Sequence, residues 1–423
     1  MATSLRNLTI ATTRATLAPV ATLPSSCVTS LPTPRAKGLT SRRSNSTIAC
    51  RALSRSWQKP RVPTLQSVSR NPHASRSLAS ASDSTSKFAF GISSSFSAKD
   101  RRFNPAKNVF NFNPYNHILA RRKDKSTRPD SGQDAFFISR VGESSDVAFG
   151  IADGVGGWVD SGVDPADFSH GFCDYMAHAA YTHKPDVAKP HLGARNLMQR
   201  GYEDICDDGS VRAGGSTACV GIVRGSGKLE VANLGDSGFV QLRLNAVHSY
   251  SEPQTHAFNT PYQLSIIPKQ MRARQAAFGG QQLCDMPKDA NASQHALRHG
   301  DVLVFASDGV WDNLSRHDVL KIVSKIMVSA KAWVHTEKGI DVGPHISNFI
   351  TTDDVSSGDE EIPPLQSFLA VGIAHEAKMA SVNTKLDGPF AREVQREYPN
   401  ENWRGGKVDD ICVVVVVVCE EGK

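Results

Sequence analysis

The chain of 423 residues lacks any apolar run long enough to cross a bilayer, which needs about 20 consecutive residues. Its most apolar stretch, Ile411–Cys419, reads ICVVVVVVC and is far too short. The β-branched residues and the charged flanks of this stretch predict a buried strand instead. The sequence therefore predicts a protein without a transmembrane segment.

Several familiar reactive motifs are also missing. The eight cysteines show neither CxxC nor zinc-ligand spacing, so they are predicted to be reduced thiols and not disulfides or metal ligands. The chain has no GxxxxGK[ST], no HExxH, and no Cys-x5-Arg preceded by His. These absences argue against a P-loop nucleotide site, a zinc protease and cysteine-based phosphate chemistry.

Acidic residues are absent from the first 82 positions, which contain twelve Lys and Arg. The whole chain carries a formal charge of +6, so the remainder carries −6 and gives no reason to expect nucleic-acid binding. An acid-free segment rich in Arg, Ser, Thr and Ala, without the apolar core of a secretory signal, is typical of a mitochondrial or plastid transit peptide. A basic extension that binds an acidic partner is the alternative.

Ordered structure is predicted to begin near Phe103, where Ser and Arg give way to FNPAKNVFNFNPY. We therefore expect two regions. Residues 1–102 form a transit peptide and disordered basic tail, and residues 103–423 form one folded domain.

From Asp134 onward, short apolar runs that end at Gly or Asp predict at least seven strands. They are DAFFISRV, DVAFGIADG, STACVGIV, LEVANLGDSG, FVQLRL, DVLVFASDG and ICVVVVVV. Helical spacing predicts helices, and an acidic composition predicts a surface loop at Gly339–Pro364. The helices are Pro165–His183, Leu192–Ile205, His317–Trp333 and Leu365–Leu386. Because strands and helices come in blocks, we expect an α+β sandwich with sheets inside and helices outside.

Four segments share one pattern, an apolar strand that ends in Asp beside Gly or a second acid. They are IADGVGG at Asp153, LGDSG at Asp236, ASDGVWD at Asp308, and VDDI at Asp409 and Asp410. The sheet holds such a carboxylate while its oxygens project from the rim, and a neighbouring Gly lets a backbone carbonyl approach a cation. Converging carboxylates repel one another unless cations neutralise them, and all-oxygen ligands favour Mg²⁺ or Mn²⁺ over zinc.

Two such ions about 3.5 to 4 Å apart clamp the attacking and leaving oxygens of an in-line displacement and lower the pKa of a bridging water. The pattern therefore predicts phosphoester hydrolysis by attack of a metal-bridging hydroxide. No amino-acid nucleophile is needed for that chemistry.

The order ADGVGGW, GGSTA, GDSG, SDGVWDN, VDDI resembles the metal-dependent protein phosphatases of the 2C type, over roughly residues 134–419. DGVGGWVDSGVDPADF, HAFNTPYQLS and GGKVDDI are similar to the mitochondrial branch of that family. The resemblance implies a four-layer α-β-β-α sandwich, with two central antiparallel sheets flanked by helices. It also implies a monomeric serine/threonine phosphatase of the mitochondrial matrix, acting on phosphoproteins with two or three Mg²⁺ or Mn²⁺ ions. Composition alone leaves the plastid open.

By position, the resemblance gives catalytic metal-binding roles to Asp153, Asp308 and Asp409. Asp153 would bridge two ions, and the carbonyl of Gly154 would ligate one of them. Asp308 and Asp409 would hold the same ion, and Asp236 would share a third, weaker ion with Asp308.

Three further residues follow from the resemblance. Asp134 would support the ions through bound water, and Asp410 would lie beside the ligand Asp409, although a one-residue slip between the two acids stays open. Arg128 is the candidate for the substrate phosphate, with a solvated surface arginine as the alternative.

Two departures from the family pattern bear on the chemistry. Val155 stands where many members have a His proposed to protonate the leaving group, and Gln133 replaces a Glu. A pseudophosphatase that serves as a regulatory binding module is one alternative, and a two-metal hydrolase of small phosphate esters or nucleic acids is another. The complete ligand set favours an active phosphatase, since loss of a positioned acid costs about 10²- to 10⁴-fold without abolishing hydrolysis.

Overall fold

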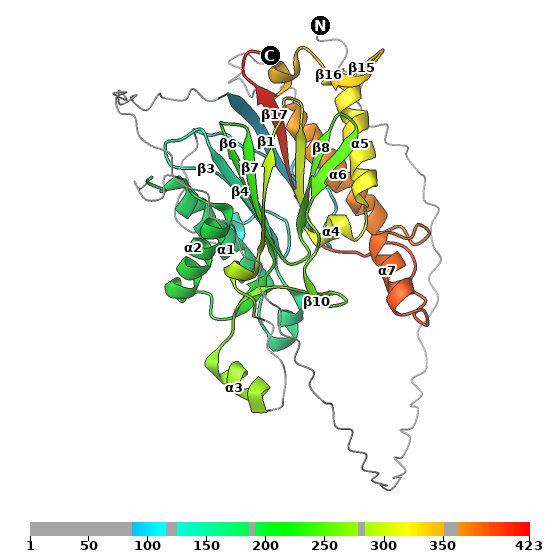
Figure 1. Cartoon of the computed structure of the whole chain (residues 1–423). Coiled ribbons are helices and arrows are strands. Elements are labelled where there is room, and N and C mark those ends of the chain that lie inside the picture. The colour runs from blue at the N-terminus through cyan, green and yellow to red at the C-terminus, as the bar shows by residue number, and fades with distance from the viewer. Residues whose placement is uncertain (1–86, 116–124, 186–190, 278–283, 351–362) are drawn as a thin grey trace, which may run out of the picture. The chain divides into compact units, whose positions relative to one another are not determined.

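The computed structural model describes residues 87–115, 125–185, 191–277, 284–350 and 363–423. Residues 1–86 of the predicted transit peptide and basic tail (1–102) lie outside these described residues. In the described ranges, two antiparallel sheets lie face to face with helices on their outer faces, as Figure 1 shows. The predicted α+β sandwich of four layers is confirmed.

The first sheet contains six strands in the order β2-β1-β17-β14-β8-β9. They are β1 (Phe88–Ser97), β2 (Val109–Asn111), β8 (Gly238–Arg243), β9 (Ala246–Tyr250), β14 (Val302–Ala306) and β17 (Ile411–Glu420). Strand β17 lies between β1 and β14, and its side chains alternate between two cores. Val413 and Val415 pack toward the helices, whereas Val414 and Val416 pack toward the second sheet. Burial on both faces explains the run of valines.

The second sheet contains five strands in the order β13-β7-β6-β4-β3. They are β3 (Asp134–Arg140), β4 (Val147–Asp153), β6 (Ala218–Arg224), β7 (Lys228–Leu234) and β13 (Asn291–Ala296). Between the two sheets, Phe149 of β4 meets Phe305 of β14 edge to face, with ring centroids 4.9 Å apart. This aromatic core fixes the separation of the sheets whose rims carry the predicted site.

Three short two-stranded ladders complete the strands. They are β5 (Gly214–Ser216) with β12 (Leu264–Ile266), β10 (Thr255–Ala257) with β11 (Thr260–Pro261), and β15 (Trp333–Thr336) with β16 (Gly339–Val342).

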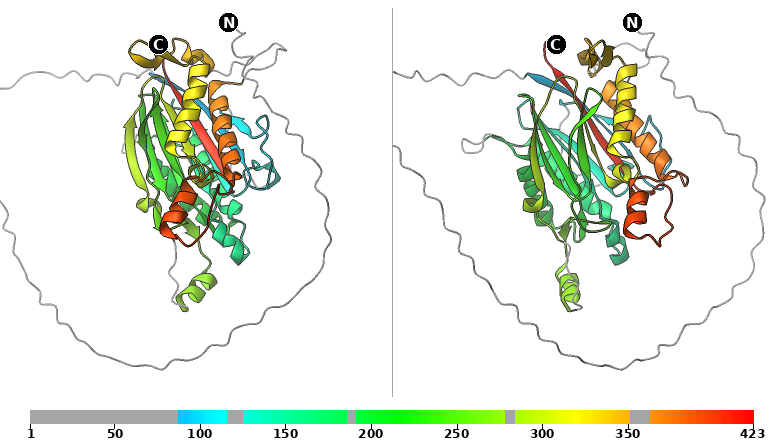
Figure 2. Two further views of the ribbon diagram at one scale, coloured as in Figure 1. Left: turned by 90° about the vertical axis from the view of Figure 1, so that its right-hand side faces the viewer. Right: turned by 45° about the vertical axis from the view of Figure 1, so that its right-hand side comes forward.

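Two pairs of helices cover the sheets (Figures 1 and 2). Helices α1 (Pro165–Tyr181) and α2 (Ala194–Asp208) pack on the five-stranded sheet, and α5 (Arg316–Ser329) and α6 (Leu365–Ser381) pack on the six-stranded sheet. Asp164 caps α1 by accepting the N–H of Ala166, which explains where that helix begins. The other helices are α3 (Lys269–Ala277), α4 (Asp308–Trp311) and α7 (Pro389–Glu397), with 3₁₀ segments at Lys125–Thr127, Gly156–Ser161, Pro287–Asp289 and Ile346–Phe349. None of the helices in the described ranges has the length and apolar character that crossing a bilayer requires.

Three sequence predictions need correction. The predicted boundary between residues 102 and 103 is wrong, because β1 begins at Phe88 and pairs with β17 along its whole length. The predicted helix His317–Trp333 is too long, since Trp333 begins β15, and the predicted loop from Gly339 begins with β16. The central part of that loop, residues 351–362, lies outside the described residues.

Candidate active site

Asp134 and Asp153 lie opposite each other at one end of the five-stranded sheet. Asp134 is the first residue of β3 and Asp153 is the last residue of β4, and the antiparallel register pairs them directly. Asp134 is only 1% exposed. Strand pairing therefore holds two carboxylates from separate sequence motifs side by side.

Gly154 follows Asp153 at a position where a side chain does not fit. Its N–H donates to the carbonyl oxygen of Gln133 at 3.1 Å, and an added Cβ would lie 2.8 Å from that same oxygen. Gly154 also forms an isolated bridge with Ser216. The missing side chain lets the backbone after Asp153 run close to its neighbours, as the role predicted for the Gly154 carbonyl requires.

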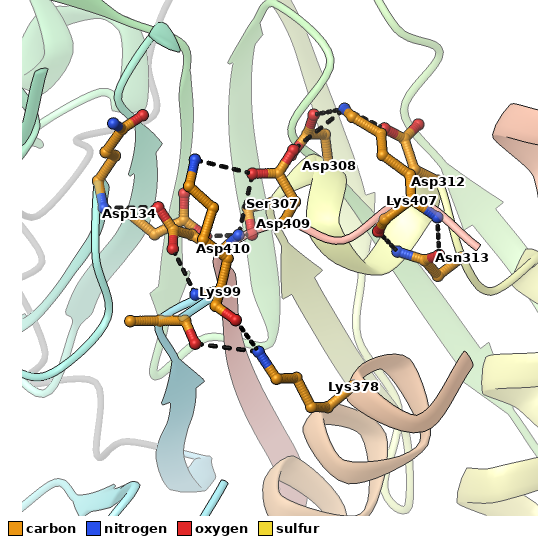
Figure 3. A network of polar contacts seen from close by, with 12 residues as sticks. Lys99, Asp134, Ser307, Asp308, Asp312, Asn313, Lys378, Lys407, Asp409 and Asp410 are labelled. Atoms are coloured by element: carbon orange, nitrogen blue, oxygen red, sulfur yellow. Dashed lines mark hydrogen bonds and ion pairs between the residues drawn. The ribbon is translucent and has the colours of Figure 1, made fainter. Parts of the chain in front are cut away.

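Asp308, Asp409 and Asp410 come from the adjoining edge of the six-stranded sheet. Asp308 begins α4 just after β14, and the two consecutive acids directly precede β17. Because β14 and β17 run antiparallel with Ala306 opposite Val413, the end of β14 and the beginning of β17 lie at the same edge. Residues about 100 positions apart are brought together in this way (Figure 3).

Ser307 connects the two sheets at this edge. Its hydroxyl donates to Asp134 Oδ2 at 2.6 Å and accepts the N–H of Cys412 at 3.0 Å. Ser307 is fully buried. The hydrogen bonds therefore link the carboxylate of β3 to β14 and β17 without solvent between them (Figure 3).

Asp409 and Asp410 have different surroundings. The carboxylate of Asp410 accepts the backbone N–H of Lys99 at 2.7 Å and of Gln133 at 2.8 Å, one on each oxygen. The carboxylate of Asp409 lies on the side of Asp308, and Asp308 is the strongest of its charged neighbours. Asp410 is therefore engaged by backbone donors, whereas Asp409 faces the other acids.

Asp236, in the turn between β7 and β8, completes the group. Its Oδ1 is buried and has no hydrogen-bond partner. Burial, and then the charge of Asp308, raise the pKa of Asp236 to about 7. An unpaired buried oxygen of this kind is the atom that a bound cation would satisfy.

Mutual repulsion marks the whole cluster. Burial raises the pKa of Asp153 well above its usual range, and the charges of Asp308, Asp134, Asp236 and Asp409 raise it further. Asp134 behaves in the same way, with burial as the largest cause and the hydrogen bond from Ser307 opposing it. Each ionised carboxylate makes ionisation of the others costlier. The cluster therefore needs bound positive charge if all its acids are to ionise.

Two lysines approach the cluster in the described contacts: the ammonium of Lys99 lies 3.9 Å from Asp409 Oδ1, and Lys407 lies closer, against three of the acids. Its ammonium lies 2.6 Å from Asp308 Oδ2, 2.6 Å from Asp312 Oδ2 and 3.2 Å from Asp409 Oδ2 (Figure 3). Burial alone would lower the pKa of Lys407, but the three carboxylates outweigh it and raise that pKa. No role was predicted for Lys407 or Asp312, although Lys407 lies in the motif GGKVDDI and Asp312 in SDGVWDN.

The donor set fits Mg²⁺ or Mn²⁺ in its chemistry. Every candidate ligand is a carboxylate or carbonyl oxygen, which such ions prefer, and Asp236 offers an unsatisfied oxygen. Within the described residues, however, no three His, Cys, Asp or Glu side chains have the spacing of a complete metal site. Three of the acids converge on the ammonium of Lys407 instead.

Arg128 is paired with an acid that is not one of the clustered carboxylates. Its guanidinium donates to Asp167 of α1 at 2.9 Å, and its side chain is only 13% exposed. Burial works against ionisation of Asp167, but hydrogen bonds from Lys125 and Arg128 outweigh it and lower the pKa of Asp167. The described contacts therefore pair Arg128 with a residue of α1. The phosphate-binding role of Arg128 stays a prediction.

A cleft of about 350 Å³ opens beside the carboxylates, and Asp236 and Asp312 lie in its wall. Aromatic side chains line it as well, among them Phe258, Trp311 and Phe390. Phe258, between β10 and β11, and Phe390, on α7, lie with ring centroids 5.4 Å apart. The cleft thus joins an apolar surface to the acidic cluster.

No protein-family model matches the chain. It is 31% identical over 291 residues to the 5-azacytidine resistance protein azr1 of Schizosaccharomyces pombe, covering 69% of this chain and 83% of that protein. It is 31% identical over 305 residues to Protein phosphatase 2C homolog 7, mitochondrial, of Saccharomyces cerevisiae, covering 71% and 78%. It is 32% identical over 290 residues to Protein phosphatase PTC7 homolog of Danio rerio, covering 68% and 82%.

Among solved structures, the chain is similar to the photosystem II phosphatase PBCP, with a TM-score of 0.48 and 21% identity over 78% of this chain and 98% of that chain. It is also similar to the catalytic domain of the serine/threonine protein phosphatase PstP, solved with two manganese ions, with a TM-score of 0.41 and 14% identity over 79% and 100%.

Proposed function

The chain belongs to the protein phosphatase 2C family and is a metal-dependent serine/threonine protein phosphatase, and on that premise we propose that Asp153, Asp308 and Asp409 carry its hydrolysis. The main support is the convergence of these acids at the joined rims of both sheets. Five carboxylates lie close together here, and they need nearby cations if all of them are to be ionised at once.

The proposed ligand roles follow the surroundings of each residue. Asp153, with the Gly154 carbonyl, and Asp308 with Asp409 would hold two Mg²⁺ or Mn²⁺ ions, and Asp236 would hold a third. Asp134 and Asp410 would fix the ligands from behind, because both are buried and hydrogen-bonded to the chain. Bound ions would supply Lewis acidity to the phosphate and to the attacking water.

The protein itself would hold the site together between turnovers. Ser307 fixes Asp134 against β17, and Asp410 ties the segments at Lys99 and Gln133 to the start of that strand. Val155 occupies the position of the family's proposed proton donor, so no described side chain next to Asp153 replaces that donor. The leaving-group proton must then come from solvent held at the site.

The test uses the chain from Lys87 onward with phosphoserine peptides. We expect phosphate release only with Mn²⁺ or Mg²⁺. Asp153→Asn should reduce kcat/KM by about 100-fold or more, because changing a residue that merely supports a metal ligand already costs about 10- to 100-fold. Asp160→Asn, an exposed acid close by in sequence, is the matched control and should retain activity. Metal binding without turnover on any phosphopeptide would favour a noncatalytic binding module.

We propose that the cleft beside the carboxylates receives the substrate residues that flank the phosphorylated serine or threonine. Its continuity with Asp236 and Asp312 supports this, and Phe258 and Phe390 favour a large apolar side chain there. Phe258→Ala should raise KM about tenfold for a phosphopeptide with such a neighbour. The same variant should leave turnover of para-nitrophenyl phosphate unchanged, and equal losses on both substrates would contradict the proposal.

We propose mitochondrial import, with the matrix as destination, and a monomeric enzyme acting on mitochondrial phosphoproteins. The acid-free, Arg-rich residues 1–82 and the yeast relative named as mitochondrial support import. A fluorescent reporter fused to residues 1–86 should collect in mitochondria. Signal in plastids or throughout the cytosol would overturn the proposal, and light scattering of the purified chain tests the monomer.

A further inference from the structure

Lys407 is held in place by more than its charge. Its backbone N–H donates to Asn313 Oδ1 at 2.9 Å, and its carbonyl accepts from Asn313 Nδ2 at 2.8 Å. The same Asn313 nitrogen donates to the carbonyl of Gly309 at 2.9 Å. Asn313 therefore ties the segment before β17 to α4, and the start of the lysine side chain is fixed beside Asp308 (Figure 3).

The head of Lys407 is matched to its surroundings. The ammonium donates hydrogen bonds to Asp308 and Asp312 at 2.6 Å each, and it forms an ion pair with a third carboxylate, Asp409, at 3.2 Å. The side chain is only 15% exposed, and the ammonium lies 5.0 Å from the centre of the Phe390 ring. A flexible surface lysine would not keep three contacts in such a buried position.

The acids on the other side of the cluster have no such partner. Asp236 Oδ1 is buried without a hydrogen bond, and Asp153 is surrounded by four further carboxylates. Two of the three acids that Lys407 contacts, Asp308 and Asp409, are proposed to hold one metal ion. The ammonium and that ion would therefore need the same carboxylate oxygens.

We propose that Lys407 is a built-in competitor for one metal ion: its ammonium neutralises Asp308, Asp312 and Asp409 in the metal-free enzyme and must be displaced before a divalent ion binds there. This inference rests on the proposed function, since it assumes that Asp308 and Asp409 are ligands. It implies that the ions bind in order. The ion held by Asp153 and the Gly154 carbonyl would bind first, and the ion held by Asp308 and Asp409 would bind more weakly because Lys407 opposes it.

The test measures Mn²⁺ binding by titration calorimetry, without substrate. Lys407→Met keeps the approximate length of the side chain and removes the charge, so the weaker Mn²⁺ step should tighten by about ten- to a hundredfold, a change as large as the loss that follows removal of a supporting neighbour but opposite in sign. In chelator, the thermal midpoint of this variant should fall, because three acids lose their counter-charge. Lys321→Met is the matched control, since it makes the same change at an exposed lysine that pairs with Asp318 outside the cluster, and it should leave both measurements nearly unchanged.

Unchanged or weaker Mn²⁺ binding by Lys407→Met would overturn the proposal. A raised KM for phosphopeptide with unchanged Mn²⁺ binding would do so too, and would make Lys407 a substrate-binding residue. If Lys407→Met does not fold without metal, Lys407→Arg keeps the charge and should bind Mn²⁺ no more tightly than the native chain. Absence of phosphatase activity in the native chain would contradict the proposed function alone, because these binding measurements do not depend on turnover.

Discussion

Two adjacent acids, Asp409 and Asp410, illustrate how neighbouring residues acquire different roles. Asp410 is 4% exposed and accepts two backbone N–H groups, whereas Asp409 faces Asp308 and Lys407. Hydrogen bonds from backbone amides stabilise a carboxylate without any cation. The described contacts give Asp409 one backbone donor, the N–H of Asp410. Its charge must therefore be balanced by a cation, either the ammonium of Lys407 or a metal ion.

We predict opposite consequences when these two acids lose their charge. In Asp410→Asn the side chain keeps a single acceptor oxygen, so one N–H of Lys99 or Gln133 is left buried and unpaired. The free energy of unfolding should fall by about 1–3 kcal/mol. In Asp409→Asn the metal-free chain should keep its stability, whereas Mn²⁺ affinity should fall about ten- to a hundredfold or more.

Urea unfolding without metal and a calorimetric Mn²⁺ titration separate the two effects. Each variant is the control for the other, because both remove one carboxylate from the same dipeptide. If Asp410→Asn loses Mn²⁺ binding and keeps its stability, the metal ligand is Asp410 and the assignment slips by one residue.

The sequence contains a clear signal for the strand-end aspartates but none for their counter-charge. Asp153 and Asp308 stand out because each follows an apolar run and precedes Gly. The contacts of Lys407 with Asp308 and Asp312 depend on β14 pairing with β17 across about 100 residues, which no local pattern encodes. Arg128 shows the reverse case, where a plausible phosphate ligand is paired with Asp167.

Among the elements, seven strands were predictable because each has an apolar run of the expected length: β3, β4, β6, β7, β8, β14 and β17. Strand β1 was not, because its sequence FAFGISSSFS continues the serine-rich composition of the preceding tail. Two of its buried serines have hydrogen-bond partners: Ser93 donates to Asn111 Oδ1 at 2.8 Å and Ser95 to the carbonyl of Asn108 at 2.7 Å. Polar residues satisfied inside a sheet give no hydrophobic pattern to detect.

Strand β1 therefore sets where the chain can be shortened. A chain that starts at Phe103 loses Phe88, Ile92 and Phe96 from the core between the sheets and leaves one edge of β17 unpaired. Each buried side chain of this size contributes about 2–5 kcal/mol, and together they rival the total stability of about 5–15 kcal/mol. We predict that this shorter chain does not fold and aggregates through β17.

A chain that starts at Lys87 is the control, because it keeps β1 and removes only residues outside the described ranges. Its circular dichroism and urea midpoint should equal those of the full-length protein. A chain starting at Phe103 with the same midpoint would show that β1 is dispensable.

At the scale of the whole molecule, folding brings carboxylates that repel one another to the edge where the two sheets meet. Asp134 and Asp153 come from one sheet, Asp308 and Asp409 from the other, and Ser307 joins them. The folded chain forces these carboxylates together, whereas the unfolded chain keeps them apart. Without metal, the free energy of unfolding should therefore fall as these acids ionise. Metal binding should restore it.

This gives a pH dependence of stability with a definite sign. The pKa of Asp236 is raised to about 7 in the folded state, chiefly by burial and then by Asp308, against about 3.9 when unfolded. The folded state therefore binds this proton more tightly. Without metal, the contribution of Asp236 to the free energy of unfolding should fall by roughly 2–4 kcal/mol as pH rises from about 4 to about 7.

Urea unfolding of the metal-free chain and of Asp236→Asn between pH 4.5 and 7.5 tests this prediction. Partly buried histidines such as His183 and His295, whose pKa values are lowered chiefly by desolvation, give the opposite slope, but they are common to both chains and cancel in the difference. Asp236→Asn should therefore gain stability over the native chain as pH rises, and saturating Mn²⁺ should reverse that order, because the ion stabilises the ionised carboxylate. A difference independent of pH would mean that Asp236 is ionised without a cation, and the cluster would then lack the repulsion that its metal binding is expected to relieve.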